Sequence, residues 1–341
     1  MTVEAHYHWL VAPGKIDWLR EAIEPEKILP TEVCCRTLYS AISPGTELAA
    51  FDGLEPLRPN VSVFPRWLGY MNISAVIAAG VEAAAEFPLG TLVYTGAAHR
   101  SCFVLDKSKV LAKVPAGINA ADAALAYLYR LALVGLVRGR GKIVGSNAVV
   151  GLGAIGQCAI ELAQSSGARC LGVSDHSVAK DAAHSLGASV LGRADVESQF
   201  GAKQPDENLF EQVLVTTNSW RDWKIAMSLA RFGGIISVIG FPGRGQPAPA
   251  FNPLLPSLFY DRQLTIASAG FASSALGEGR ESPESLSKDM NDILRWMESG
   301  RIKPQRLVID QHPASDLSGA YKRLKESDRG AGTIVLDWGG V

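Results

Sequence analysis

The stretch that decides the fold is AVVGLGAIGQCAIELAQSSGARCLGVSDHS, residues 148–177. An apolar strand-like run ends at Val150 and is followed by a glycine-rich turn, residues 151–156. A helical pattern of apolar residues then closes at Gly167, and a second strand-like run, residues 168–174, comes after it. A strand, a glycine-rich turn, a helix and a second strand at this spacing predict a βαβ unit that binds a dinucleotide.

The glycines of this turn have separate predicted roles. Gly151 allows the tight turn, Gly153 lets the backbone approach a pyrophosphate, and Gly156 lets the helix and the strand pack closely. Ala154 and Ile155 complete the predicted cofactor-binding turn, where free N–H groups at the helix start face the anion. The alternative is an ordinary strand-to-helix turn without a ligand, and the agreement of turn, spacing and second strand disfavours it.

The end of the second strand predicts which dinucleotide binds. An acid about 20 residues beyond the turn would hold the 2′-hydroxyl of NAD, whereas small or basic residues leave room for the NADP phosphate. Ser174 stands where the acid is expected, and together with His176, Ser177 and Lys180 it would suit a phosphate. Asp175 could still reach the ribose if the register differs by one residue. The sequence therefore favours NADP(H) over NAD(H).

Two later strand ends are also expected near the cofactor. Thr216 and Thr217 end the fourth strand of this region, and Gly240 and Phe241 end the fifth. Ligands of open α/β sheets bind at the carboxyl ends of the strands. Threonine at such a position is also common in loops that bind nothing.

Composition bounds the class of protein. The 341 residues carry a formal net charge of −1 and are 47% hydrophobic, which suits two domains with separate cores. Near-neutral charge disfavours a nucleic-acid or membrane-surface partner. The amino-terminal residues lack the pattern of a secretory signal, and five scattered cysteines disfavour a disulfide framework, so a cytoplasmic protein is expected. The apolar run 123–137 contains Arg130 and is interpreted as a buried helix.

The pattern along the chain predicts an α/β protein. Residues 1 to about 117 are β-rich, with short strand-like runs bounded by Gly, Pro or charged residues. From residue 121 onward, helical stretches alternate with short apolar strands, which predicts a doubly wound parallel sheet. A Gly- and Ser-rich loop after Ala269, a helix and the closing strand GTIVLDW complete the chain.

Several longer stretches resemble one superfamily. They are RTLYSAISPGTELAAFDG (36–53), RWLGYMNISAV (66–76), GGIISVIGFPG (233–243) and the carboxy-terminal ASDLSGAYKRLKESDRGAGTIVLDW (314–338). With the layout above, they make the chain similar to the medium-chain dehydrogenase/reductase superfamily over essentially its whole length. The branch that looks nearest is the zinc-type alcohol dehydrogenases that include bacteriochlorophyllide dehydrogenase-like proteins. The resemblance implies a GroES-like catalytic domain, residues 1–117 with 271–341, and a Rossmann domain, residues 118–270.

The chain departs from this family at the expected zinc ligands. In zinc members the loop that corresponds to residues 41–53 presents a cysteine, where this chain has Ser43. A Gly-His-Glu stretch is replaced by Gly69-Tyr70-Met71, the third ligand region holds Tyr129 and Arg130, and the four-cysteine structural lobe is absent. Because zinc prefers thiolate, imidazole or carboxylate ligands, no zinc is expected. The alternative is a zinc ion held through Glu47 and His99.

Zinc-free relatives are mostly quinone, enone or enoyl-thioester reductases that use NADPH. The resemblance therefore implies a zinc-independent NAD(P)H-dependent oxidoreductase. Hydride would pass to a small carbonyl or conjugated enone in the cleft between the domains, and hydroxyl donors would hold its oxygen. The predicted catalytic residues are Ser43, Thr46 and Tyr70, with Arg130 gripping a carboxylate or phosphate.

Each of these residues also has a structural interpretation. Ser43 and Thr46 could cap a turn, Tyr70 could be a packed aromatic, and Arg130 could pair with a structural acid. Two other functions stay open: an NAD-dependent alcohol or polyol dehydrogenase, and a dinucleotide-binding protein without turnover. By analogy with the superfamily, a homodimer with a small-molecule substrate is expected.

Overall fold

The computed structural model describes residues 2–54, 62–138, 143–200, 209–270, 282–326 and 332–341. The chain divides into two compact units. The β-rich unit comprises Met1–Tyr127, Met290–Ser327 and Thr333–Val341, and the parallel-sheet unit comprises Leu128–Asp289 and Asp328–Gly332. The domain boundaries expected after residues 117 and 270 thus fall after residues 127 and 289, and the expected boundary residue 271 lies outside the described residues.

The parallel-sheet unit has the Rossmann-like architecture that the sequence predicts. Its six strands lie in the order β11-β10-β9-β12-β13-β14, and every neighbouring pair is parallel. The strands are β9 (Ser146–Val150), β10 (Arg169–Val173), β11 (Ser189–Leu191), β12 (Phe210–Val215), β13 (Ala230–Val238) and β14 (Thr265–Ser268).

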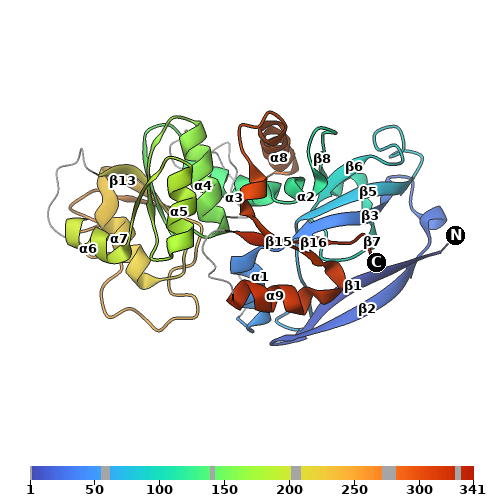
Figure 1. The fold of residues 1–341 in the computed structure, drawn as a ribbon, viewed down its shortest axis with the longest axis horizontal. Helices are drawn as coiled ribbons and strands as arrows, with labels where there is room; N and C mark the ends of the chain where they lie inside the picture. Colours follow the sequence, from blue (N-terminus) through green and yellow to red (C-terminus); the bar gives the residue numbers. More distant parts are fainter. Residues whose placement is uncertain (1, 55–61, 139–142, 201–208, 271–281, 327–331) are drawn as a thin grey trace. The chain divides into compact units, whose positions relative to one another are not determined.

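Helices cover both faces of this sheet (Figure 1). They are α3 (Ala126–Val137), α4 (Ala154–Ser165), α5 (Ser177–Ser185), α6 (Arg193–Phe200) and α7 (Trp220–Leu229). The chain moves outward from β9 through β10 to β11 and then returns to β12 and β13 on the other side of β9. Because such crossovers are right-handed, α4 and α5 cover one face of the sheet and α7 covers the other.

The β-rich unit is built mainly on antiparallel pairs, and β15 and β16 pair in parallel. Its larger sheet has the order β15-β16-β3-β5-β6-β8, with β7 paired to β3, and its smaller sheet has the order β2-β1-β4. The strands are β1 (Val3–Ala12), β2 (Lys15–Ile23), β3 (Glu32–Ala41), β4 (Arg66–Trp67), β5 (Asn72–Ala79), β6 (Leu92–Thr95), β7 (Cys102–Asp106), β8 (Val110–Lys113), β15 (Val308–Pro313) and β16 (Thr333–Asp337). The helices are α1 (Pro44–Phe51), α2 (Ala120–Ala123), α8 (Pro283–Glu298), which begins before residue 289, and α9 (Leu317–Glu326). Short 3₁₀ turns lie at Pro25–Lys27, Lys107–Lys109, Pro304–Leu307 and Ala314–Asp316.

One core of the β-rich unit fixes the position of α1. Leu48 and Phe51 of α1 pack with Leu317 and Tyr321 of α9 and with Leu336 of β16. The Phe51 and Tyr321 rings meet edge to face at 5.2 Å. The loop that precedes α1 is therefore held between β3 and a buried helix.

The apolar run expected to be a buried helix forms helical structure from Ala120 to Val137. By length and composition this stretch could cross a membrane, but 78% of it is buried within the protein. It is therefore a core helix, as the sequence analysis interpreted it.

Candidate active site

The candidate site of the β-rich unit begins where β3 gives way to α1. Ser43 occupies the N-cap position with extended backbone angles, and Pro44 fills the first helical position, which its fixed φ suits. The Ser43 side chain makes no capping hydrogen bond. Instead, the Glu47 carboxylate reaches back and accepts the Ser43 N–H at 2.6 Å. The Ser43 hydroxyl is therefore not used to cap the turn.

The Ser43 hydroxyl is paired with Tyr70. The Tyr70 O–H donates to Ser43 Oγ at 2.5 Å, and the Thr46 side chain also hydrogen-bonds to Tyr70. Burial raises the pKa of the Tyr70 hydroxyl well above its usual value, the nearby Glu47 charge raises it further, and the bonds to Ser43 and Thr46 oppose the shift only in part. Tyr70 therefore stays protonated at neutral pH. The structure thus brings together the three hydroxyls that the sequence analysis singled out.

Glu47 lies in a buried polar network beside this pair. It is 2% exposed, and its Oε2 accepts hydrogen bonds from His99 Nε2 at 2.8 Å and from the Tyr321 hydroxyl at 2.6 Å. The other ring nitrogen of His99 lies 2.8 Å from Ser40 Oγ, which also accepts the indole N–H of Trp338 at 2.9 Å. A buried carboxylate needs such donors to offset its lost hydration.

Gly69 shows how tightly the His99 ring fits beneath the segment that carries Tyr70. A Cβ at Gly69 would lie 2.6 Å from His99 Nε2, and the Gly69 φ of +84° suits glycine. The backbone of the segment also holds the histidine, because the His99 N–H donates to the Leu68 carbonyl at 2.8 Å. Glu47 thus holds Ser43 through its backbone N–H, and His99 packs against the segment that carries Tyr70.

The donor set of this site does not suit zinc. The Ser43 and Tyr70 side chains of the site are hydroxyls, and hydroxyls are poor zinc ligands. Glu47 and His99 are residue types that do bind zinc, but they are hydrogen-bonded to each other. Glu47 also accepts from Ser43 and Tyr321, and His99 also contacts Ser40. Among the described residues, no three His, Cys, Asp or Glu side chains gather as a metal-binding group.

Arg130 is placed in a structural setting. Its side chain is fully buried in α3, and its Nε lies 3.4 Å from Asp289 Oδ2. Its neighbour Tyr129 is also buried and donates to Glu161 at 2.5 Å. This arrangement favours the structural alternative for Arg130, and a role in gripping a substrate stays a prediction.

The aromatic residues near the site separate into two groups. The Tyr70 and Tyr127 rings meet edge to face at 5.5 Å. Trp67 instead packs 4.5 Å from Trp9 and 5.0 Å from Tyr7. Tyr70 and Trp67 therefore belong to separate aromatic groups, although they are three residues apart in the sequence.

The glycine-rich turn of the other unit has the geometry of an anion cradle. A Cβ at Gly156 would lie 2.0 Å from the Gly151 carbonyl oxygen, which shows the close packing of helix and strand. Gly151 has a φ of +99°, and a Cβ there would lie 2.3 Å from Thr217 Cγ2. A Cβ at Gly153, the N-cap of α4, would meet nothing within 4 Å. The open space stands above Gly153 alone, which suits the approach of a pyrophosphate.

The predicted strand-end residues gather around this turn. The Thr216 hydroxyl donates to the Gly151 carbonyl at 2.9 Å, and a Cβ at Gly240 would lie 2.1 Å from the Thr217 carbonyl oxygen. Phe241 is exposed, and its N–H donates to Asn218 Oδ1 at 2.9 Å. Thr216, Thr217 and Gly240 therefore line the base of the turn.

At the end of β10, Ser174 and Asp175 differ in burial and in their hydrogen-bond partners. Ser174 is buried, and its Oγ accepts the His176 N–H at 3.2 Å. Asp175 is exposed, and its two oxygens accept the backbone N–H of Arg193 at 2.8 Å and its Nη1–H at 3.2 Å. His176 is the N-cap of α5 and Lys180 lies in its first half. The residues expected at the ribose therefore do stand at one strand end.

Sequence reasoning missed several members of these networks. Tyr321 donates to Glu47, 274 residues away, and Trp338 donates to Ser40, 298 residues away, which in turn contacts His99. Arg193 and Asp222 were likewise not singled out. Polar residues at buried positions in α9 and after β11 and β12 would have indicated Tyr321, Arg193 and Asp222. Burial at these positions cannot be recognised from the sequence alone.

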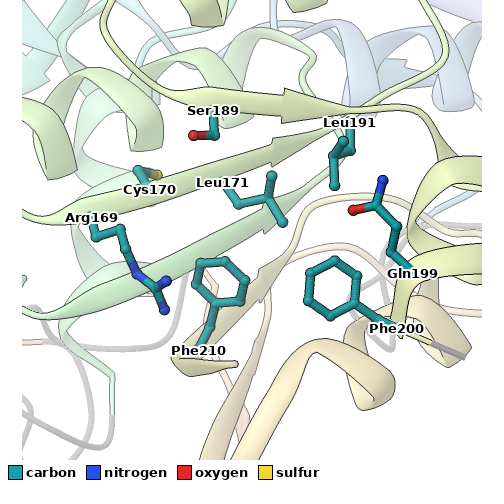
Figure 2. Close-up of a pocket in the computed structure, with 8 residues that line it drawn as sticks. All are labelled: Arg169, Cys170, Leu171, Ser189, Leu191, Gln199, Phe200 and Phe210. Carbon is teal, nitrogen blue, oxygen red and sulfur yellow. The ribbon is translucent and has the colours of Figure 1, made fainter. Parts of the chain in front are cut away.

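A cavity of about 320 Å³ lies elsewhere in the parallel-sheet unit (Figure 2). Arg169 and Phe210, the first residues of β10 and β12, line it together with Phe200. The cavity extends along β10 and β11 as far as Leu191, the last residue of β11. Residues 151–156 of the glycine-rich turn are not among its lining residues.

No protein-family model matches the chain, and no curated protein matches it in sequence. Solved structures do match in fold. An alcohol dehydrogenase from Thermus sp. ATN1 has a TM-score of 0.75 and 19% identity, covering 97% of this chain and 99% of that one. An alcohol dehydrogenase from Escherichia coli CFT073 in complex with NADH has a TM-score of 0.77 and 13% identity, covering 98% and 99%. A putative NADPH:quinone reductase from Bacillus thuringiensis has a TM-score of 0.77 and 16% identity, also covering 98% and 99%. These likenesses confirm the expected α/β fold.

Proposed function

We propose that the protein is a zinc-independent, NAD(P)H-dependent oxidoreductase that reduces a small carbonyl or conjugated enone. The observation that carries this proposal is the Ser43–Tyr70 hydroxyl pair, backed by buried Glu47, in a chain that also holds a glycine-rich dinucleotide turn. The dinucleotide fold alone is shared by enzymes of many chemistries, so the reaction has to be argued from this pair.

The residues of the turn fit a dinucleotide. Gly151, Gly153 and Gly156 with the start of α4 would hold the pyrophosphate, and Thr216 and Thr217 would line the site from below. When bound, a reduced nicotinamide supplies a hydride. Ser174 in the position of the usual ribose acid supports a preference for NADP(H).

The hydroxyls would act on the substrate oxygen. Tyr70 donates its proton to Ser43 Oγ, so the Ser43 O–H proton is directed away from Tyr70 and is available to a substrate oxygen. Donation from Tyr70 strengthens that O–H as a donor, since hydrogen bonds in a chain polarise one another. Thr46, which is exposed, is placed to add a second donor. As negative charge develops on the oxygen, these donors stabilise it through hydrogen bonds, and water supplies the proton that completes the reduction.

An NAD-dependent alcohol or polyol dehydrogenase is the second candidate. Alcohol dehydrogenases are among the matched structures, and one of them is in complex with NADH. The same hydroxyl pair would then hydrogen-bond the alcohol oxygen, and the alcohol proton would pass to water. A cytoplasmic homodimer is a further proposal from the superfamily resemblance, and β14 is the outer strand through which its sheets would pair.

The test is turnover of the purified protein with a panel of enones, quinones and aldehydes, following NADPH absorbance. Ser43→Ala and Tyr70→Phe should lower kcat about 100-fold or more, because each removes part of the hydroxyl pair that stabilises the developing negative charge. Trp67→Phe, a change to an aromatic outside the hydroxyl pair, should leave kcat within about twofold. Dinucleotide affinity should not change in any of the three variants. Full activity of both hydroxyl variants would contradict the proposal.

A further inference from the structure

Three strand ends of the parallel sheet carry one connected ionic network. Asp175 follows β10, Arg193 follows β11, and Thr217 and Asp222 follow β12. These strands are parallel, and Val173 at the end of β10 pairs with Leu191 at the end of β11. The network therefore stands at the carboxyl edge of the sheet, and Thr217 belongs both to it and to the base of the glycine-rich turn.

Arg193 is fixed in this network by a buried acid. Its Nε donates to Asp222 Oδ1 at 2.6 Å and its Nη2 donates to Oδ2 at 2.9 Å, a two-pronged pair. Asp222 is fully buried and also accepts the Thr217 hydroxyl at 2.7 Å. A guanidinium held in this way cannot rotate away without leaving a buried carboxylate uncompensated.

The remaining donors of Arg193 engage Asp175. Its backbone N–H and its Nη1 each donate to one oxygen of Asp175, at 2.8 and 3.2 Å. The Asp175 side chain is 51% exposed, so this contact lies at the surface while the Asp222 contact lies inside. The Asp175 carboxylate, which could have accepted a ribose hydroxyl, is thus already paired with the Arg193 guanidinium.

We propose, building on the dinucleotide site of the proposed function, that Arg193 determines cofactor choice in favour of a 2′-phosphorylated adenosine. Its fixed guanidinium engages the Asp175 carboxylate, which is then not free to accept a ribose hydroxyl. Nη1 would exchange its contact with Asp175 for a contact with the 2′-phosphate. Because a phosphate carries about two negative charges, it competes with the longer surface contact to Asp175 and leaves the Asp222 pair intact. Ser174, one residue earlier, leaves the space that an acid would otherwise take.

The test compares two fragments that differ only in the 2′-phosphate, 2′,5′-ADP and 5′-AMP, by isothermal titration calorimetry. The wild type should bind 2′,5′-ADP at least tenfold more tightly. Asp175→Asn should strengthen 2′,5′-ADP binding severalfold and change 5′-AMP binding little. Arg193→Gln combined with Asp222→Asn, which removes both members of the buried pair, should abolish the preference. Circular dichroism and the melting temperature establish that this double variant is folded.

Arg221→Gln is the matched control. Arg221 lies near the same edge but pairs with Glu197 on the surface, so its loss should leave the fragment preference within about twofold. Equal binding of both fragments, or a 5′-AMP affinity that falls in Asp175→Asn, would overturn the role of Arg193 while leaving a dinucleotide site. Failure of both fragments and of both whole dinucleotides to bind would overturn the proposed function as well.

Discussion

At the scale of single residues, Glu47 and Asp222 are the two buried carboxylates around which the sites are built. Each is 2% exposed or less, and each is satisfied by donors from several elements. Glu47 accepts from Ser43, His99 and Tyr321, and Asp222 accepts from Arg193 and Thr217. Satisfied buried charges of this kind fix the positions of their partners. Ser43 and Arg193 therefore stand on rigid supports.

Removing Arg193 alone should destabilise the protein strongly. Arg193→Gln leaves the Asp222 carboxylate buried without its cation, which costs about 3–5 kcal/mol. The double change Arg193→Gln with Asp222→Asn should recover most of that loss, since no uncompensated charge remains. Urea unfolding at pH 7 measures both. Equal losses in the single and double variants would show that the ion pair itself contributes the stability.

His8 should make stability depend on pH. Burial lowers the pKa of His8 from 6.5 to about 3, and the hydrogen bond from Nε2 to the Ala314 carbonyl opposes this only in part. Between these two values the unfolded chain binds a proton that the folded chain does not. Stability from this group is therefore complete above about pH 6.5 and is lost as the pH falls, by about 2 kcal/mol at pH 5.

Urea unfolding at pH 7 and pH 5 checks this dependence. In His8→Gln, the loss of stability between the two pH values should be smaller than in the wild type by about 2 kcal/mol. Other titrating groups affect both proteins equally, so the comparison isolates His8. An unchanged difference between the two pH values would mean that His8 is protonated in the folded protein.

At the scale of elements, the turn between β9 and α4 offers two glycines with opposite predicted behaviour. Gly153→Ala places a methyl group in open space, so stability should hold while dinucleotide affinity falls about tenfold or more. Gly156→Ala forces a methyl group against the Gly151 carbonyl, 2.0 Å away, and should cost about 1–3 kcal/mol. Thermal unfolding and calorimetric titration separate the two effects. Unchanged NADPH affinity in Gly153→Ala would argue against a pyrophosphate at this turn.

The same elements show what sequence could predict. The βαβ unit was predictable because strand, turn and helix carry local patterns within 30 residues. The boundaries between the units fall inside α3 and α8, at residues that carry no Gly or Pro, so the sequence did not mark them. The Glu47–His99–Tyr321 network could not be predicted, since its contacts span 52 and 274 residues and depend on how α9 packs on α1.

At the scale of the whole molecule, each unit supplies one part of the proposed chemistry. The β-rich unit holds the hydroxyl donors in a donor set unsuited to zinc, and the parallel-sheet unit holds the glycine-rich turn and the Arg193 network. The sequence analysis grouped Ser43, Thr46 and Tyr70 through a resemblance, and the structure brings their hydroxyls together. Their support by Glu47 was not predictable, because only folding brings His99 to that carboxylate.

The most direct test of zinc-independent reduction is NADPH oxidation by protein treated with a strong chelator and freed of metal, measured with the same panel of enones, quinones and aldehydes. Metal content is measured in parallel. Turnover that persists at full rate without metal, and that falls about 100-fold in Tyr70→Phe, is the predicted result. Turnover that disappears with the metal and returns when zinc is added would contradict the assignment of the reaction to the hydroxyl pair.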